Sequence, residues 1–199
     1  MGQYYKAVVL GEDGTVYWVN PHDYGSGFKL MEHSWMTNRF VDSVASLIWK
    51  NPRRVAWVGD YSDSRDGSAY ERNIPDLVFM TIYNDTWSEG ADNHRARPEK
   101  LLAVDDAKYL VDHTSRCYVD LDAYAKANGF HAEWMRLDDE WVVHPLPLLT
   151  ACGNGRGGGD YHSIYPDYDK VGIWAFHTLE MTDELPEGYD PVSFNFKEV

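Results

Sequence analysis

The stretch ACGNGRGGGDYH, residues 151–162, combines five glycines with one arginine and one aspartate. Glycine admits backbone conformations that are closed to other residues, so successive N–H groups can converge on an anion. Arg156 adds a planar guanidinium that matches phosphate or carboxylate. We therefore predict that this loop binds a small anionic ligand.

The predicted ligand-binding residues are His144, Gly153, Asn154, Gly155, Arg156, Gly157, Gly158, Gly159, Asp160 and His162. The two histidines could hold a polar ligand or exchange protons with it. The spacing matches neither the Rossmann fingerprint nor a P-loop, so a glycine-rich crossover without a ligand stays open as the alternative. We interpret the neighbouring Cys152 as an inert thiol rather than a nucleophile.

A second polar group lies in HDYGSGFKLMEHSW, residues 22–35. His22, Asp23 and His33 are residue types that zinc or manganese accepts, but they do not have a recognised ligand spacing. Gly25 and Gly27 favour turns. We therefore expect no metal and assign the charged side chains to the surface or to a polar pocket.

A third group, GDYSDSRDG at residues 59–67, carries Asp60, Asp63 and Asp66. When Gly67 is aligned with the invariant glycine of a calcium loop, Asn73 stands where glutamate is required. This mismatch favours an acidic turn. Asp60 directly follows an expected strand and is a candidate pocket residue.

The formal net charge of −14 disfavours general binding to DNA or RNA. The longest basic cluster, NHRARPEK at residues 93–100, is interrupted by Pro98 and Glu99, and we interpret it as a solvated loop. An acidic surface could instead attract a basic host protein. Without a signal-peptide pattern or a long apolar segment, we expect a cytoplasmic protein that does not enter a membrane.

Several regular elements must position these groups. Residues 3–10 and 15–20 predict a β-hairpin around an acidic turn, and 108–112 with 117–121 predict a second. Apolar residues at helical spacing predict a helix from Asn38 to the Asn51–Pro52 stop. Residues 54–61, 77–83 and 171–181 are expected strands, the last one central, and 122–128 a short helix before Gly129.

Together these elements predict one globular α+β domain over residues 1–199, with a mostly antiparallel sheet, one major helix and long loops. The glycine-rich loop is expected between two strands. The tryptophans and tyrosines are abundant enough that some could stack on a flat ligand.

Four segments, MGQYYKAVVLGEDG, HDYGSGFKLMEHSW, RVAWVGDY and HPLPLLTACGNGRGGGDY, carry a further signal. Together they resemble a family of short bacteriophage, prophage and gut-bacterial proteins. The resemblance implies a cytoplasmic accessory protein of a bacterium or of a phage-infected cell. It brings no activity and no site residue with it.

Three hypotheses for function follow. The first is a counter-defence protein that sequesters a small anionic ligand, such as a nucleotide or a nucleotide signal. The second is an acidic inhibitor that covers the basic surface of a host nucleic-acid-binding enzyme. The third is a hydrolase or transferase on a phosphorylated or ADP-ribosyl substrate, with His144, Asp160 or His162 as acid or base. The sequence indicates no particular cofactor.

Overall fold

The computed structural model describes residues 4–59, 93–103, 106–128, 142–152 and 166–196. Its strands are β1 Tyr5–Leu10, β2 Val16–Val19, β3 Arg53–Gly59, β4 Asn93–Arg95, β5 Tyr109–Asp112, β6 Cys117–Asp120, β7 Ala151–Cys152, β8 Thr178–Thr182 and β9 Asp190–Pro191. Its α-helices are α1 Arg39–Leu47, α3 Leu121–Ala127 and α4 Pro145–Leu149. Short 3-10 helices are η1 Pro21–Tyr24, η2 Leu30–Glu32 and η6 Tyr168–Lys170.

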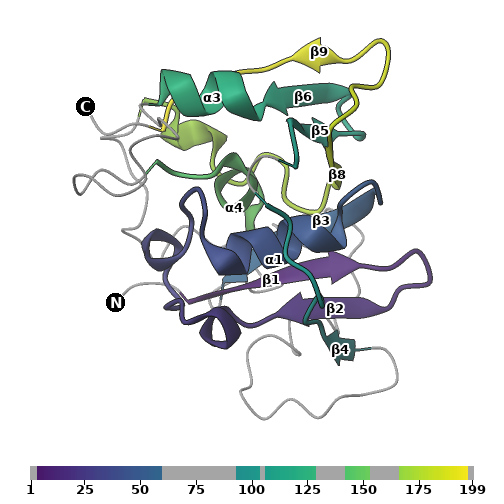
Figure 1. Cartoon of the computed structure of the whole chain (residues 1–199), viewed down its shortest axis with the longest axis vertical. Helices are drawn as coiled ribbons and strands as arrows, with labels where there is room; N and C mark the ends of the chain where they lie inside the picture. The colour runs from purple at the N-terminus through teal and green to yellow at the C-terminus, as the bar shows by residue number, and fades with distance from the viewer. Residues whose placement is uncertain (1–3, 60–92, 104–105, 129–141, 153–165, 197–199) are drawn as a thin grey trace.

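The described strands form a single sheet in the order β4-β2-β1-β3-β8-β5-β6-β9, with β7 beside β3. Figure 1 shows β4 and β9 at opposite ends of the molecule. The α+β class is confirmed, but the sheet is mixed, and the prediction of a mostly antiparallel sheet is wrong. Parallel pairs form where β4, β7 and β9 join β2, β3 and β6. Each of these parallel pairs joins two segments that are far apart in the chain, which sequence-local hairpin signals do not reveal.

The predicted hairpins are confirmed. β1 pairs with β2 and β5 with β6, both antiparallel, and the expected strand near residue 54 is β3, which lies against β1. Because successive side chains alternate across a sheet, β1 and β3 contribute apolar residues to both faces. One of these faces forms a small buried cluster that includes Val8, Trp18 and Val58.

The other face packs against α1, the predicted helix, which crosses in front of β1 in Figure 1. Asn38 caps its start, because its side-chain oxygen accepts a hydrogen bond from the backbone N–H of Phe40 at 2.9 Å. Phe40, Val41 and Val44 are fully buried against the sheet. The apolar spacing seen in the sequence therefore marks the buried face of the helix.

The expected central strand over residues 171–181 is wrong in its first half. Only Thr178–Thr182 is β-strand, and residues 171–176 form successive turns. Gly172 has a φ of +82°, and a Cβ atom there would lie 2.4 Å from the carbonyl oxygen of Ala151. Trp174 and Phe176 are nevertheless buried, so the apolar composition reflects burial of a turn rather than a strand covered on both faces.

The short helix expected at residues 122–128 is α3, with Asp120 as its N-cap and Asn128 as its C-cap. Residues 145–149, ahead of the glycine-rich loop, form α4, and the two-residue strand β7 follows and leads into the loop. The expected strand over 77–83, the acidic turn with Asp60, Asp63 and Asp66, and Gly129 lie outside the described residues. Among the described helices, none has the length and apolar character needed to cross a membrane.

Candidate functional site

Most of the predicted ligand-binding residues belong to the glycine-rich loop. The predicted ligand residues Gly153, Asn154, Gly155, Arg156, Gly157, Gly158, Gly159, Asp160 and His162 lie outside the described residues. The loop therefore remains a prediction. Cys152, just before it, is buried, as is Cys117, and burial raises the pKa of the Cys117 thiol to about 11.

His144 is the predicted site residue that the structure does place, and it caps a helix. Its Nδ1 accepts a hydrogen bond from the backbone N–H of Leu146 at 3.0 Å, at the start of α4. Its own backbone N–H donates to the carbonyl oxygen of Ser34. Burial lowers the pKa of His144 to about 3, so the ring is neutral at physiological pH. This environment gives His144 a structural role in positioning α4.

The histidines of the second polar group are not brought together. His33 is fully buried, where Nδ1 lies 2.9 Å from the carbonyl oxygen of Gly27 and Nε2 accepts a hydrogen bond from the indole of Trp57. His22 is exposed and lies against Phe28, with ring centroids 4.1 Å apart. Across the described ranges, no group of three or more His, Cys, Asp or Glu side chains could hold a metal ion.

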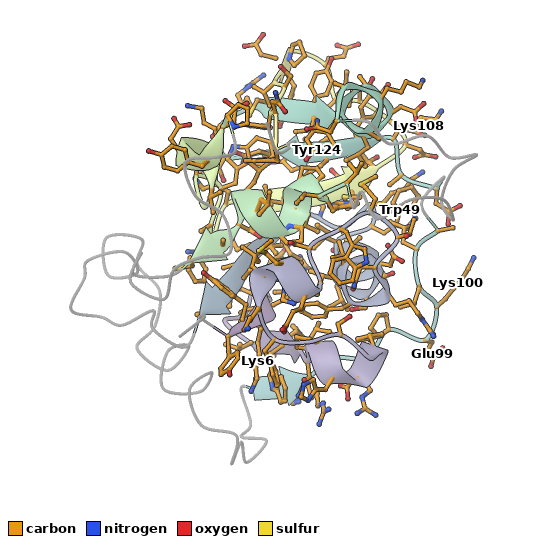
Figure 2. All side chains as sticks on the ribbon, turned by 90° about the vertical axis from the view of Figure 1, so that its left-hand side faces the viewer. Lys6, Trp49, Glu99, Lys100, Lys108 and Tyr124 are labelled. Carbon is orange, nitrogen blue, oxygen red and sulfur yellow. The ribbon has the colours of Figure 1, made fainter. Side chains whose placement is uncertain are left out.

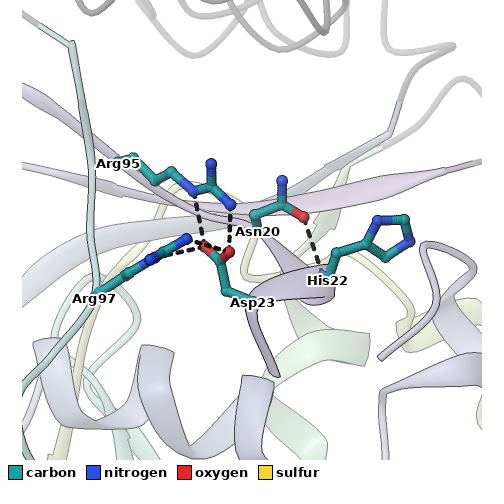
Figure 3. A network of polar contacts seen from close by, with 5 residues as sticks. All are labelled: Asn20, His22, Asp23, Arg95 and Arg97. Atoms are coloured by element: carbon teal, nitrogen blue, oxygen red, sulfur yellow. Dashed lines mark hydrogen bonds and ion pairs between the residues drawn. The ribbon is translucent and has the colours of Figure 1, made fainter. Parts of the chain in front are cut away.

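Asp23, in contrast, is the centre of a charged network (Figure 3). Arg95 and Arg97 each donate hydrogen bonds from Nε and Nη2 to its carboxylate, with Nε to Oδ2 distances of 2.7 and 3.0 Å. The Asp23 side chain is 8% exposed, whereas Arg95 and Arg97 are 34% and 62% exposed. The carboxylate therefore lies beneath two guanidiniums that face outward.

Local structure explains why these three residues meet. Asn20 caps η1 by accepting a hydrogen bond from the backbone N–H of His22 at 3.0 Å, which orients the turn that carries Asp23. β4 pairs with β2, the strand that leads into η1, and Trp18 lies opposite Arg95 in that pairing. The sheet thus brings the basic segment onto the acidic turn.

Burial opposes ionisation of Asp23, but the hydrogen bonds from Arg95 and Arg97 outweigh it, and its pKa lies below the ordinary value. The carboxylate is thus ionised near neutral pH. Two guanidiniums and one carboxylate leave one net positive charge on this network.

Aromatic rings extend the network inward from the surface, since Trp18 and Lys6 are only 5% and 7% exposed. The guanidinium of Arg95 and the ammonium of Lys6 each lie 5.4 Å from the ring centroid of Trp18. Lys6 also lies 5.9 Å from the centroid of Phe28, whose ring contacts Tyr4 and His22. We name this group the arginine–aromatic cluster; its members are Tyr4, Lys6, Trp18, His22, Asp23, Phe28, Arg95 and Arg97.

Figure 2 places Lys6, a member of this cluster, at the lower end of the molecule, far from Lys108 and Tyr124 at the upper end.

The interpretation of residues 93–100 as a solvated loop missed this cluster, because Arg95 and Arg97 bind the carboxylate of Asp23, which is far away in the sequence. Their spacing of two residues was the available signal, since it puts both side chains on the same side of an extended segment.

Another cluster of polar side chains, separate from the arginine–aromatic cluster, lies near the turn between β5 and β6. His177 Nδ1 donates to Oδ2 of Asp112 at 2.8 Å, and the Asp112 side chain has no exposed surface. His113 Nε2 lies 2.8 Å from Oε2 of Glu180, and its Nδ1 lies 2.8 Å from the hydroxyl of Tyr189. We name these five residues the histidine–carboxylate cluster. Carboxylates that orient imidazoles in this way are common in sites of proton transfer.

Burial opposes ionisation of Asp112 as well. Hydrogen bonds from His177 and Ser115 outweigh that effect and hold the pKa of Asp112 below the ordinary carboxyl value. The backbone N–H of Thr114 donates to its other oxygen at 2.8 Å. Asp112 is therefore a buried carboxylate that fixes the ring of His177 and the start of the turn.

Comparisons of this chain with protein-family models, with curated proteins and with solved structures find no match. The candidate function consequently depends on the geometry of the two clusters.

Proposed function

We propose that the protein binds a small anionic ligand that carries a flat ring, such as a nucleotide, at the arginine–aromatic cluster. The observation that carries this proposal is that Arg95 and Arg97 share one carboxylate. Each guanidinium donates to Asp23 from the edge formed by its Nε and Nη2 atoms. Asp23 neutralises half of their charge and orients both groups.

The unused donors suit an oxyanion. Each guanidinium has five N–H donors, and the contacts with Asp23 use the edge formed by Nε and Nη2. In the described part of the chain, the Nη1 groups of Arg95 and Arg97 donate no hydrogen bond. Arg97 is 62% exposed, so a phosphate or carboxylate can approach its outer edge from solvent.

The aromatic members suit a flat ring. Tyr4 is 53% exposed and lies edge-on to Phe28, and His22 lies against the same Phe28 ring. Lys6 links this aromatic row to Trp18 and adds a positive charge beside it. A base or similar ring could stack on the row while its anionic group pairs with the arginines.

The positive cluster also contrasts with the charge of the whole chain, which is −14. In a protein with this excess of acidic residues, a local group of cations concentrates anions that the remaining surface repels. If the chain is a phage-type accessory protein, as its resemblance implies, such binding would sequester a nucleotide signal.

A panel of ligands tests the proposal. Purified protein is heated with inorganic phosphate, nucleoside mono-, di- and triphosphates and cyclic dinucleotides, and the melting temperature is recorded for each. At least one nucleotide should stabilise the protein, and Arg97→Ala should remove that stabilisation. Lys126→Ala is the matched control, because Lys126 pairs with a single exposed carboxylate, that of Asp122, on α3 at the other end of the molecule. If no nucleotide stabilises the wild-type protein, the proposal is wrong.

A further inference from the structure

Three strands bring a hydroxyl, an imidazole and a carboxylate together at the end of the sheet opposite the arginine–aromatic cluster. β5 and β8 are antiparallel with Val111 opposite Glu180, so His113, just after β5, is diagonal to Glu180 on the same face. β9 runs parallel to β6 from the pair Cys117 and Asp190, which places Tyr189 beside the same turn.

One tautomer of a neutral His113 satisfies both contacts. An ionised carboxylate only accepts hydrogen bonds, so in this tautomer Nε2 carries the proton and donates a hydrogen bond to Glu180. Nδ1 then has a lone pair and accepts the hydrogen bond from the hydroxyl of Tyr189, 2.8 Å away. This is the arrangement of a hydroxyl nucleophile, its base and the group that orients the base.

The surroundings leave the phenol accessible and define its charge environment. Tyr189 is partly exposed, and the guanidinium of Arg116 lies 5.4 Å from its ring centroid. Glu180 hydrogen-bonds the same imidazole and Asp190 follows in the chain, so acidic groups outnumber this arginine. An excess of negative charge repels a phosphate ester and accepts an uncharged donor.

We propose that Tyr189 is an activated nucleophile that accepts an acyl group from an uncharged carboxylic ester. The Tyr189 oxygen attacks the ester carbonyl carbon and forms a new C–O bond. The hydroxyl proton passes to Nδ1 of His113, and the resulting imidazolium is stabilised by Glu180. The bond to the leaving alkoxide or phenoxide breaks, and that oxygen takes the proton from His113. The products are acyl-Tyr189 and an alcohol or phenol.

The test uses the full chain and 4-nitrophenyl acetate. Peptide mass spectrometry at short reaction times measures acetylation at each tyrosine, with Tyr17 and Tyr168, 38% and 48% exposed, as internal references. Tyr189 should be acetylated at least tenfold faster than both. A rate at Tyr189 equal to or below that of the references would overturn the proposal without any variant.

Two variants and one second reagent sharpen the test. His113→Gln should slow acetylation of Tyr189 at least tenfold and leave Tyr17 and Tyr168 unchanged, with folding checked by circular dichroism. Glu180→Gln should slow it less, because Glu180 acts through the imidazole. 4-Nitrophenyl phosphate should leave Tyr189 unmodified. Unchanged acetylation in a folded His113→Gln variant, or phosphorylation of Tyr189 in place of acetylation, contradicts the proposal.

Discussion

Arg97 lies mostly in solvent, yet its Nε and Nη2 both donate hydrogen bonds to the nearly buried carboxylate of Asp23. A long surface side chain is thus fixed in one orientation by an acceptor beneath it. The interaction has one consequence for stability and another for binding, and the two can be measured separately.

The stability consequence concerns Asp23 itself. Asp23→Asn should lower the free energy of unfolding by about 1 kcal/mol at pH 7, because the charge-assisted hydrogen bonds from both arginines weaken. Burial opposes ionisation of Asp23 but the arginines lower its pKa below the unfolded value. Its contribution is therefore complete above about pH 4 and is lost as the pH falls through the folded-state pKa.

Urea unfolding of wild type and Asp23→Asn between pH 7 and pH 2.5 checks this prediction. The difference between the two proteins should shrink at the acid end of the series. A difference that stays constant across the whole range would mean that the charge of Asp23 contributes nothing to folding.

Buried histidines should make the fold sensitive to acid at a higher pH. Burial lowers the pKa of His33 to about 4 and that of His144 to about 3. Histidines in the unfolded chain take up protons below about pH 6.5, so stability should fall with decreasing pH from there until each folded-state pKa is reached. The slope approaches ~1.4 kcal/mol per pH unit for each histidine.

His144→Asn tests this directly, because asparagine can still cap α4 through its side-chain oxygen but does not titrate. The variant should show a shallower dependence of unfolding free energy on pH between about 4 and 6.5. The exposed His94 provides the control: His94→Asn should keep the wild-type slope. Equal slopes for wild type and His144→Asn would argue against a neutral, buried His144.

The turns at residues 171–176, where a strand was expected, require glycine at position 172 for full stability. Gly172→Ala should destabilise the fold by about 2–3 kcal/mol, because φ is positive and the added Cβ meets the carbonyl oxygen of Ala151 at 2.4 Å. Gly25 has a similar φ of +73° but open space around it, so Gly25→Ala should cost only about 1 kcal/mol. Chemical denaturation measures both, and equal losses would contradict the predicted clash.

Local signals account for the parts of the fold that the sequence predicts. The helix α1 follows from apolar spacing between Asn38 and Pro52, and each hairpin follows from two β-rich runs around a short turn. The parallel pairing of β2 with β4 joins residues far apart in the chain, and no local pattern specifies it. The turns around Trp174 are as apolar as a strand because they are buried. Gly172 is the residue in this segment whose type favours a turn over a continuous strand.

For the candidate site as well, local sequence patterns indicate individual residues, whereas their partners depend on the tertiary fold. The chemistry of Asp23 and His22 is visible in the sequence, but the separate surroundings of the two histidines are not: His22 lies against Phe28, and His33 is buried against Trp57. The partners of Asp23 are Arg95 and Arg97, and this pairing depends on the tertiary fold. The titratable ring of His144 favours a ligand-binding role in the sequence, but its position directly before Pro145 is equally typical of a helix N-cap.

The central claim, that Arg95 and Arg97 hold an anion, is tested most directly by calorimetric titration of the stabilising nucleotide into wild type, Arg97→Ala and Lys126→Ala. Wild type and Lys126→Ala should bind with equal affinity, and Arg97→Ala should bind at least tenfold more weakly. That loss should diminish as salt is raised, because the contact is with a charged group near the surface. Equal affinity of wild type and Arg97→Ala would contradict the assignment of the ligand to the arginine–aromatic cluster.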